Sequence, residues 1–164
     1  KTAKKVTIIF FVLISCVGCN QVTKNIAKHN LTKFETISFL NDTLRLQYAE
    51  NQGAFLSLGS TIPENMRYPI LTCFVSGVLL FLLFYQLSQI ELKIQQPLLS
   101  LILAGGTGNL IDRIFNDGRV IDFINIGIGS VRTGVFNIAD IAITLGTVWF
   151  ILLSIRHGKN NKTI

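Results

Sequence analysis

Hydrophobic and polar positions along the chain repeat on two length scales, and the longer scale is that of membrane helices. Four apolar runs are separated by polar segments, and each predicts a helix that crosses a bilayer. The predicted helices cover about residues 4–28, 66–87, 97–115 and 135–156. Pro97 opens the third helix, where its missing N–H is no loss. The pattern predicts an all-α membrane protein with four transmembrane helices.

Between the first two helices the apolar residues follow a shorter period. Over residues 34–39 and again over 44–48 they recur at spacings near two, which is typical of strands. Asn41-Asp42, between the two groups, is a turn signal. We therefore expect a small extracytoplasmic β-sheet element over about residues 31–62, within a single domain that covers residues 1–164.

The first apolar run has a second interpretation. Lysines precede it, its apolar core is short, and Leu13-Ile14-Ser15-Cys16 is similar to the lipobox of a bacterial lipoprotein signal peptide. The chain would then be a lipoprotein cut at Cys16 or Cys19, with a membrane-embedded remainder. Against this, Val22 and Ile26 continue the helical spacing beyond Cys19, which favours an intact helix that crosses the membrane.

Composition narrows the class of protein without changing this architecture. The 164 residues have a mean hydropathy of +0.50, with 49% apolar and only 15% charged residues, which argues against a soluble globule. The net charge of +6 does not indicate a nucleic-acid partner, because the basic residues lie at the chain ends and in loops. With two histidines and no H-E-x-x-H motif, we expect no metal and no other cofactor.

An even number of spans places both termini on one side of the membrane. The basic residues at the two ends predict that this side is the cytoplasm. Asp112 then lies roughly 22 Å along its helix from Pro97, and Asp140 lies roughly 24 Å before Arg156. Both carboxyl groups reach the outer leaflet, and Asp122, in the connection between the two helices, can fold back to the same level.

Asp122 and Asp140 are the candidate catalytic pair. An ionisable residue close to lipid is costly, which makes it a candidate functional group. Two carboxyl groups in a low dielectric cannot both ionise easily, so they share a proton. One can act as base toward water and the other as acid toward a departing amine, which is aspartic peptidase chemistry. The structural alternative is that Asp140 caps a helix and Asp122 pairs with Arg119 or Arg132.

Further polar residues accompany these aspartates on the last two helices. Asn109, Asp112 and Arg113 share one face of the third helix, and Asn137 lies one turn before Asp140 on the fourth. We expect Asp112 and Arg113 to form a structural ion pair. If all these carboxylates only hold helices together, the chain is a non-enzymatic four-helix membrane protein.

Four motifs resemble those of lipoprotein signal peptidase (signal peptidase II), a bacterial membrane aspartic peptidase family, over nearly the whole chain. They are G-N-x-x-D-R from Gly108 to Arg113, V-[VI]-D-F from Val120 to Phe123, F-N-x-A-D from Phe136 to Asp140, and N-x-G-A-F from Asn51 to Phe55. The resemblance implies that Asp122 and Asp140 are the catalytic dyad. The supporting or substrate-binding residues that it implies are Asn51, Gly105, Asn109, Asp112, Arg113, Asn137, Asn20 and Lys24.

The resemblance also implies the substrate and the location. The substrates would be diacylglyceryl-modified prolipoproteins, cleaved just before the lipidated cysteine at the outer face of the bacterial cytoplasmic (inner) membrane. We expect a monomer that contacts membrane lipid.

One motif departs from the family pattern. The family's D-Q-x-x-K occurs here as Asn20-Gln21-Val22-Thr23-Lys24, so an amide replaces a carboxylate. We expect Lys24 to face lipid phosphate or another acidic group, and Asn20 to satisfy backbone groups near the site. A catalytically impaired relative of the family is the alternative to an active enzyme.

Overall fold

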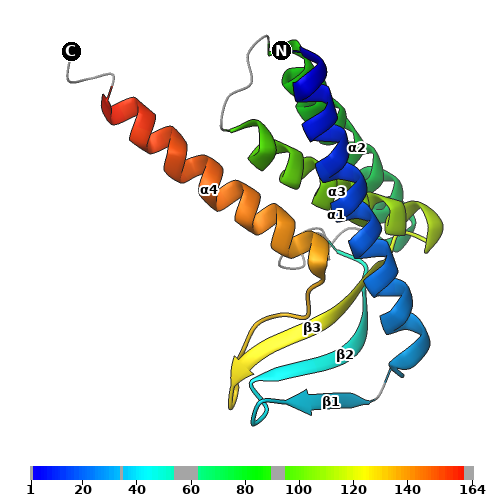
Figure 1. Ribbon diagram of the computed structural model, residues 1–164. Helices are drawn as coiled ribbons and strands as arrows, with labels where there is room; N and C mark the ends of the chain where they lie inside the picture. The colour runs from blue at the N-terminus through cyan, green and yellow to red at the C-terminus, as the bar shows by residue number, and fades with distance from the viewer. Residues whose placement is uncertain (1, 34, 54–62, 90–94, 161–164) are drawn as a thin grey trace.

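The computed structural model describes residues 2–33, 35–53, 63–89 and 95–160, and within them long helices stand above a small sheet (Figure 1). The helices are α1 (Thr2–Asn30), α2 (Glu64–Ser88), α3 (Gln96–Phe115) and α4 (Ile138–Asn160). Each contains a segment long and apolar enough to cross a membrane. The predicted fold class, an all-α membrane protein with a small β-sheet, is confirmed.

Helix α3 lies at the centre of the bundle and contacts each of the other three helices. About half of its spanning segment is buried inside the protein, whereas the spans of the other helices are mostly exposed. Large apolar side chains on those outer helices, among them Phe11, Phe74 and Phe84, are well exposed, as expected for side chains that face lipid. Small residues on α3 permit the close approach: a Cβ on Gly105 would lie 2.5 Å from the Ala139 carbonyl oxygen of α4.

The sheet is antiparallel, with its strands in sequence order. Its strands are β1 (Thr36–Phe39), β2 (Leu44–Asn51), β3 (Val120–Ile128) and β4 (Val131–Arg132). The predicted turn joins β1 to β2, and both Asn41 and Asp42 have a positive φ there. Residue 34 and residues 54–62 of the expected β element lie outside the described residues.

The structure adds one feature to the region after α3 and corrects another. The connection that carries Asp122 contains strand β3, which is buried over most of its first half and paired with β2. Helix α4 begins at Ile138 rather than near residue 135, because Phe136 still pairs with Ile124 in the sheet. The sheet therefore reaches to the first turn of α4.

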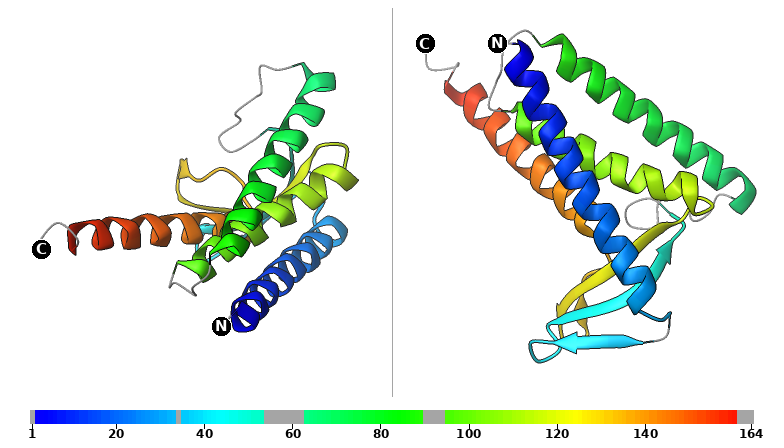
Figure 2. Two further views of the ribbon diagram at one scale, coloured as in Figure 1. Left: turned by 90° about the horizontal axis from the view of Figure 1, so that it is seen from above. Right: turned by 45° about the vertical axis from the view of Figure 1, so that its right-hand side comes forward.

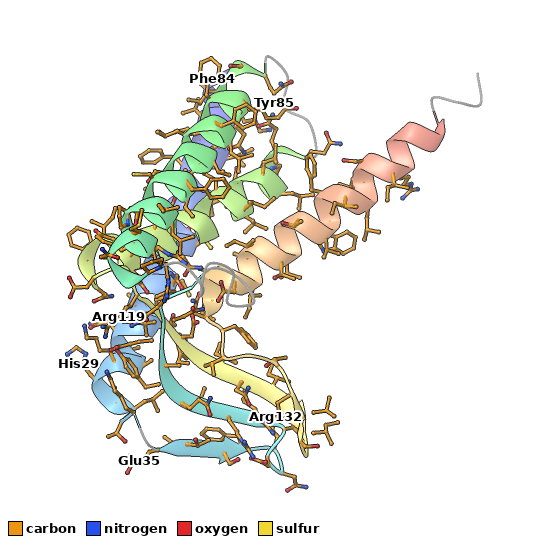
Figure 3. All side chains as sticks on the ribbon, turned by 180° about the vertical axis from the view of Figure 1, so that it is seen from behind. His29, Glu35, Phe84, Tyr85, Arg119 and Arg132 are labelled. Carbon is orange, nitrogen blue, oxygen red and sulfur yellow. The ribbon has the colours of Figure 1, made fainter. Side chains whose placement is uncertain are left out.

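The start of α1 and the end of α4 lie at the end of the helix bundle that is farthest from the sheet (Figure 1). Figure 2 shows the same separation from the side and, from above, α4 pointing away from the other helices. In Figure 3, Phe84 and Tyr85 mark the end of α2 far from the sheet, whereas Arg119 lies at the junction of helices and sheet. This junction is where the polar residues of the sequence motifs come together.

Candidate active site

Asp122 and Asp140 approach the junction from two different elements. Asp122 lies on β3, opposite Ala49 of β2, and only 3% of it is exposed. Asp140 lies in the first turn of α4 and is half-buried. Asn137 caps that helix: its Oδ1 accepts the N–H groups of Ala139 (2.8 Å) and Asp140 (3.2 Å). Asp140 Oδ2 accepts the Asn137 N–H in return at 3.0 Å, the reciprocal arrangement of a capping box.

Two asparagine side chains bridge the carboxyl groups. Asn137 Nδ2 donates to Asp122 Oδ1 at 2.6 Å and contacts Asn109 Oδ1 at 3.2 Å. Asn109 Nδ2 donates to Asp140 Oδ1 at 2.9 Å. The two aspartates are thus fixed relative to each other through neutral amides, which orient the carboxyl groups without adding charge.

The end of β2 and the residues after it close another side of the site. Asn51 Nδ2 donates to the second oxygen of Asp122, Oδ2, at 3.2 Å, while Asn51 Oδ1 accepts the Gly53 N–H at 3.0 Å. Arg113 donates from its Nη2 to the Gly53 carbonyl oxygen at 2.9 Å. Arg113 therefore connects α3 to the end of β2.

Asp112 pairs with Lys24 and not, as expected, with Arg113. Lys24 Nζ lies 2.8 Å from Asp112 Oδ2, and the side chains of both residues are 2% exposed. Adjacent residues on a helix point in different directions, so Asp112 faces α1 and β3 while Arg113 faces the end of β2. Asp112 Oδ2 also accepts the Ile121 N–H at 2.9 Å, and Oδ1 accepts from Gln21 Nε2 at 3.1 Å. Asp112 thus joins α1 to the strand that carries Asp122.

The two expectations for the first motif are confirmed. Lys24 faces an acidic group, Asp112, and it also donates to Asn109 Oδ1 at 2.8 Å. Asn20, which is fully buried, accepts the backbone N–H of Ala139 at 3.1 Å. Its amide packs against Gly108, where a Cβ would lie 2.5 Å from Asn20 Nδ2.

The arginines considered as partners for Asp122 bind elsewhere. Arg119 Nη1 lies 3.1 Å from Glu50 Oε2, and Arg132 Nη1 lies 3.5 Å from Asp42 Oδ2 out on the sheet (Figure 3). The other part of the structural alternative is present, because Asp140 does take part in capping α4. Only Oδ2 of Asp140 takes part in the cap. Its Oδ1 accepts a hydrogen bond from Asn109, through which Asp140 is linked to Asp122.

Two features near the site were missed. Gln21 links the Gly108 carbonyl oxygen (2.9 Å) to Asp112 (3.1 Å), and its place inside the first motif was a signal for it. Glu50 forms an ion pair with Lys33 at 3.1 Å and accepts the Tyr48 hydroxyl at 3.0 Å, at the edge of the junction. No sequence motif indicated this second network.

Within the described residues, no group of three or more His, Cys, Asp or Glu side chains is placed to hold a metal ion.

The environment of Asp122 favours its protonated form. Burial raises the pKa of this carboxyl group to about 6 from 3.8, and the nearby Asp140 adds to the effect. Hydrogen bonds from Asn137 and Asn51 act in the opposite direction but do not cancel it. A carboxyl group that holds its proton toward neutral pH beside a second carboxyl is suited to general acid catalysis.

This raised pKa predicts how folding stability depends on pH. The folded state binds the Asp122 proton more tightly than the unfolded state, so stability should fall as pH rises from about 4 through about 6. The loss attributable to Asp122 is about 3 kcal/mol. Asp122→Asn should lack this pH-dependent loss of stability. The difference between the unfolding midpoints of the variant and the wild type, both measured in detergent, should therefore grow over that pH interval. A constant difference would contradict the assignment.

The fold and the site define a class: a membrane protein with four helices and a pair of amide-bridged carboxyl groups where helices meet sheet. The signal peptidase (SPase) II family matches residues 12–156. The chain belongs to the signal peptidase II family and is a peptidase, as the motifs predicted.

Individual relatives support the same assignment. The lipoprotein signal peptidase of Chlorobium phaeovibrioides is 36% identical, over 93% of this chain and 96% of the relative. The lipoprotein signal peptidase of Syntrophus aciditrophicus is 31% identical, over 95% of this chain and 98% of the relative. A bacterial membrane enzyme solved by the in meso method at 2.3 Å resolution superposes with a TM-score of 0.74 and 28% identity, over 98% of this chain and 92% of that one.

Proposed function

We propose that this protein is an aspartic endopeptidase that removes signal peptides from diacylglyceryl-modified prolipoproteins, with Asp122 and Asp140 as its catalytic pair. The observation that carries the proposal is the bridge from Asp122 through Asn137 and Asn109 to Asp140. Family membership supplies the substrate class, because the curated relatives are named lipoprotein signal peptidases.

The two carboxyl groups would divide the chemistry between them. Asp140 takes a proton from a water molecule while the water oxygen attacks the scissile carbonyl carbon. Asp122, whose pKa of about 6 lets it hold the proton of the pair, donates that proton to the departing amine nitrogen as the C–N bond breaks. Exchange with solvent then returns the pair to its starting protonation. The amides of Asn51, Asn109 and Asn137 keep the carboxyl oxygens oriented during these steps.

The remaining polar residues would act on the pair through their neighbours. The Lys24–Asp112 ion pair holds Asn109 from one side and the backbone of β3 from the other. Arg113 and Gly105 fix the positions of the segment after β2 and of α4 against α3. A lipid-anchored substrate supplies the rest of the positioning, because its acyl chains keep the scissile bond at one depth.

The proposed location follows from charge and shape. Both described ends of the chain lie at the end of the bundle away from the sheet (Figure 1). Lys4 is near the start of α1 and Arg156 near the end of α4. By the positive-inside rule this end faces the cytoplasm, which places the sheet and the catalytic pair on the outer side of the cytoplasmic membrane. We propose that the protein works there as a monomer in contact with membrane lipid.

A cleavage assay on matched peptides tests the substrate class. The purified chain in detergent is given a prolipoprotein peptide that carries a diacylglyceryl cysteine, and the same peptide with an unmodified cysteine. We expect cleavage of the lipidated peptide just before the cysteine, at a rate at least about 10²-fold above that of the unmodified peptide, because the lipid supplies binding and positioning. Equal rates would remove the lipid from the proposal, and no cleavage of either peptide would favour an impaired relative.

A further inference from the structure

Asn20 has a neutral side chain at a position where a charged group would interact electrostatically with Asp122 and Asp140. It is fully buried on α1, and its Oδ1 binds the N–H of Ala139, the residue next to Asp140. Its Nδ2 lies against Gly108 and has no hydrogen-bond partner in the part of the chain that the structure describes. Asn20 is therefore in direct contact with the first turn of α4.

Five ionisable groups form what we call the charge cluster. They are Asp112, Asp122, Asp140, Lys24 and Arg113. Each of the two cations interacts electrostatically with all three carboxyl groups. When every member is ionised, three negative and two positive groups leave one negative charge uncompensated. One proton on the Asp122–Asp140 pair makes the cluster neutral, and this is the protonation state that the proposed chemistry requires.

Within the described residues, the other side chains that bind the cluster are neutral amides from every element packed around it. They are Gln21 of α1, Asn51 of β2, Asn109 of α3 and Asn137 of α4. Asn20 of α1, also a neutral amide, binds the backbone N–H of Ala139 next to Asp140. The Lys28 ammonium group, one turn beyond Lys24, contacts the Asn116 side chain at 3.4 Å instead.

The carboxylate of Glu50, on β2, has cations of its own. Lys33 and Arg119 both lie 3.1 Å from its Oε2, and Tyr48 donates to its Oε1 at 3.0 Å. Hydrogen bonds from these three groups outweigh the effect of burial and keep the pKa of Glu50 below its usual value. Glu50 is thus ionised with its partners and does not compete for the proton of the catalytic pair.

We propose that the neutral amide of Asn20 sets the charge of the cluster, and thereby the pH range in which the Asp122–Asp140 pair holds one proton. A carboxylate at position 20 would add a second uncompensated negative charge beside the pair, so the pair would hold protons more tightly. Asn20 is then a positioning residue that acts on Asp140 through α4 and on both aspartates through charge. This inference rests on the proposed catalytic pair.

The test compares Asn20→Asp with Asn20→Ser, a matched neutral control that keeps a hydrogen-bond acceptor. The measurement is kcat/KM against pH on the lipidated peptide. In Asn20→Asp we expect both limbs of the profile to move to higher pH by on the order of one unit, the size of a nearby charge in a medium of intermediate dielectric. In Asn20→Ser we expect the limbs to stay in place, whatever happens to the maximal rate. Unmoved limbs in Asn20→Asp, or an equal shift in both variants, would overturn the proposal.

Infrared spectroscopy of the wild type tests the charge count even if Asn20→Asp does not fold. At about pH 5 we expect one protonated carboxyl band from the cluster, and its loss in Asp122→Asn, where two carboxylates and two cations already balance. Two protonated groups, none, or a band that persists in the variant would overturn the inference. The infrared measurement does not need turnover. Failure of the proposed function would be seen as no cleavage by the wild type, and it is therefore distinguishable from failure of the charge count.

Discussion

Asp122→Asn, Asp140→Asn and the double variant should all retain the same small residual activity. In the proposed mechanism each carboxyl group carries one half of the acid–base chemistry, so removing either should stop the reaction and removing the second should change little further. We expect kcat to fall by at least about 10³-fold in each single variant. Initial rates on the lipidated peptide, measured with enzyme in excess where turnover is slow, check this expectation.

A matched control separates chemistry from folding in these variants. Asn125 lies on the same strand as Asp122, and its side chain binds the Thr133 carbonyl oxygen and Arg132, away from the pair. Asn125 is buried, but a carboxylate there would face Arg132 and not the pair, so Asn125→Asp should change kcat by less than a few-fold. If the single-variant losses multiply in the double variant, the two aspartates act independently and the pair is not a catalytic unit.

Lys24→Met should be the most destabilising single change near the site. It leaves the carboxylate of Asp112 buried without its cation, and breaking a buried ion pair from one side costs about 3–5 kcal/mol. Thermal unfolding in detergent should show a markedly lower Tm. The matched control is Lys33→Met, because Lys33 forms an ion pair of the same kind with Glu50 but is 59% exposed, where such pairs contribute little.

A compensating variant makes the Lys24 prediction sharper. In Lys24→Met with Asp112→Leu neither charge of this ion pair remains, so much of the lost stability should return, while the hydrogen bonds that Asp112 accepts from Ile121 and Gln21 stay lost. Equal Tm values for Lys24→Met and Lys33→Met would contradict the buried pair. So would a double variant that is less stable than Lys24→Met.

The membrane helices were predictable because lipid imposes a single strong requirement on sequence. A span must be long and apolar, and this signal does not depend on which helix packs against which. The central position of α3 could also be predicted in part from the sequence, because small residues such as Gly105 and Gly108 on a membrane helix indicate close packing. Strand β3 had a local signal in its Val, Ile and Phe residues, which favour strands, but its pairing with β2, far away in the sequence, was not predictable from any local pattern.

The members of the site were predictable as a set, but their pairing was not. Spacing along one helix places Asn109 and Asp112 on one face, and the structure joins both to Lys24. The expected Asp112–Arg113 pair was wrong because residues that are adjacent in a helix need not contact each other, and the partner of Asp112 is Lys24 on α1. The bridge from Asn137 to Asp122 depends on where β3 meets α4, and no local pattern specifies that junction.

In the proposed function, Asp122 and Asp140 together cleave the signal peptide of a lipidated prolipoprotein. The most direct test is mass spectrometry of the products after a prolonged digest of one lipidated peptide by wild type, Asp122→Asn and Asp140→Asn, each at the same concentration and each shown to be folded. We predict that the wild type releases a fragment beginning with the lipidated cysteine, and that neither variant yields more than a trace of it. Full conversion by either variant, or a wild-type cut at another bond, would contradict the claim.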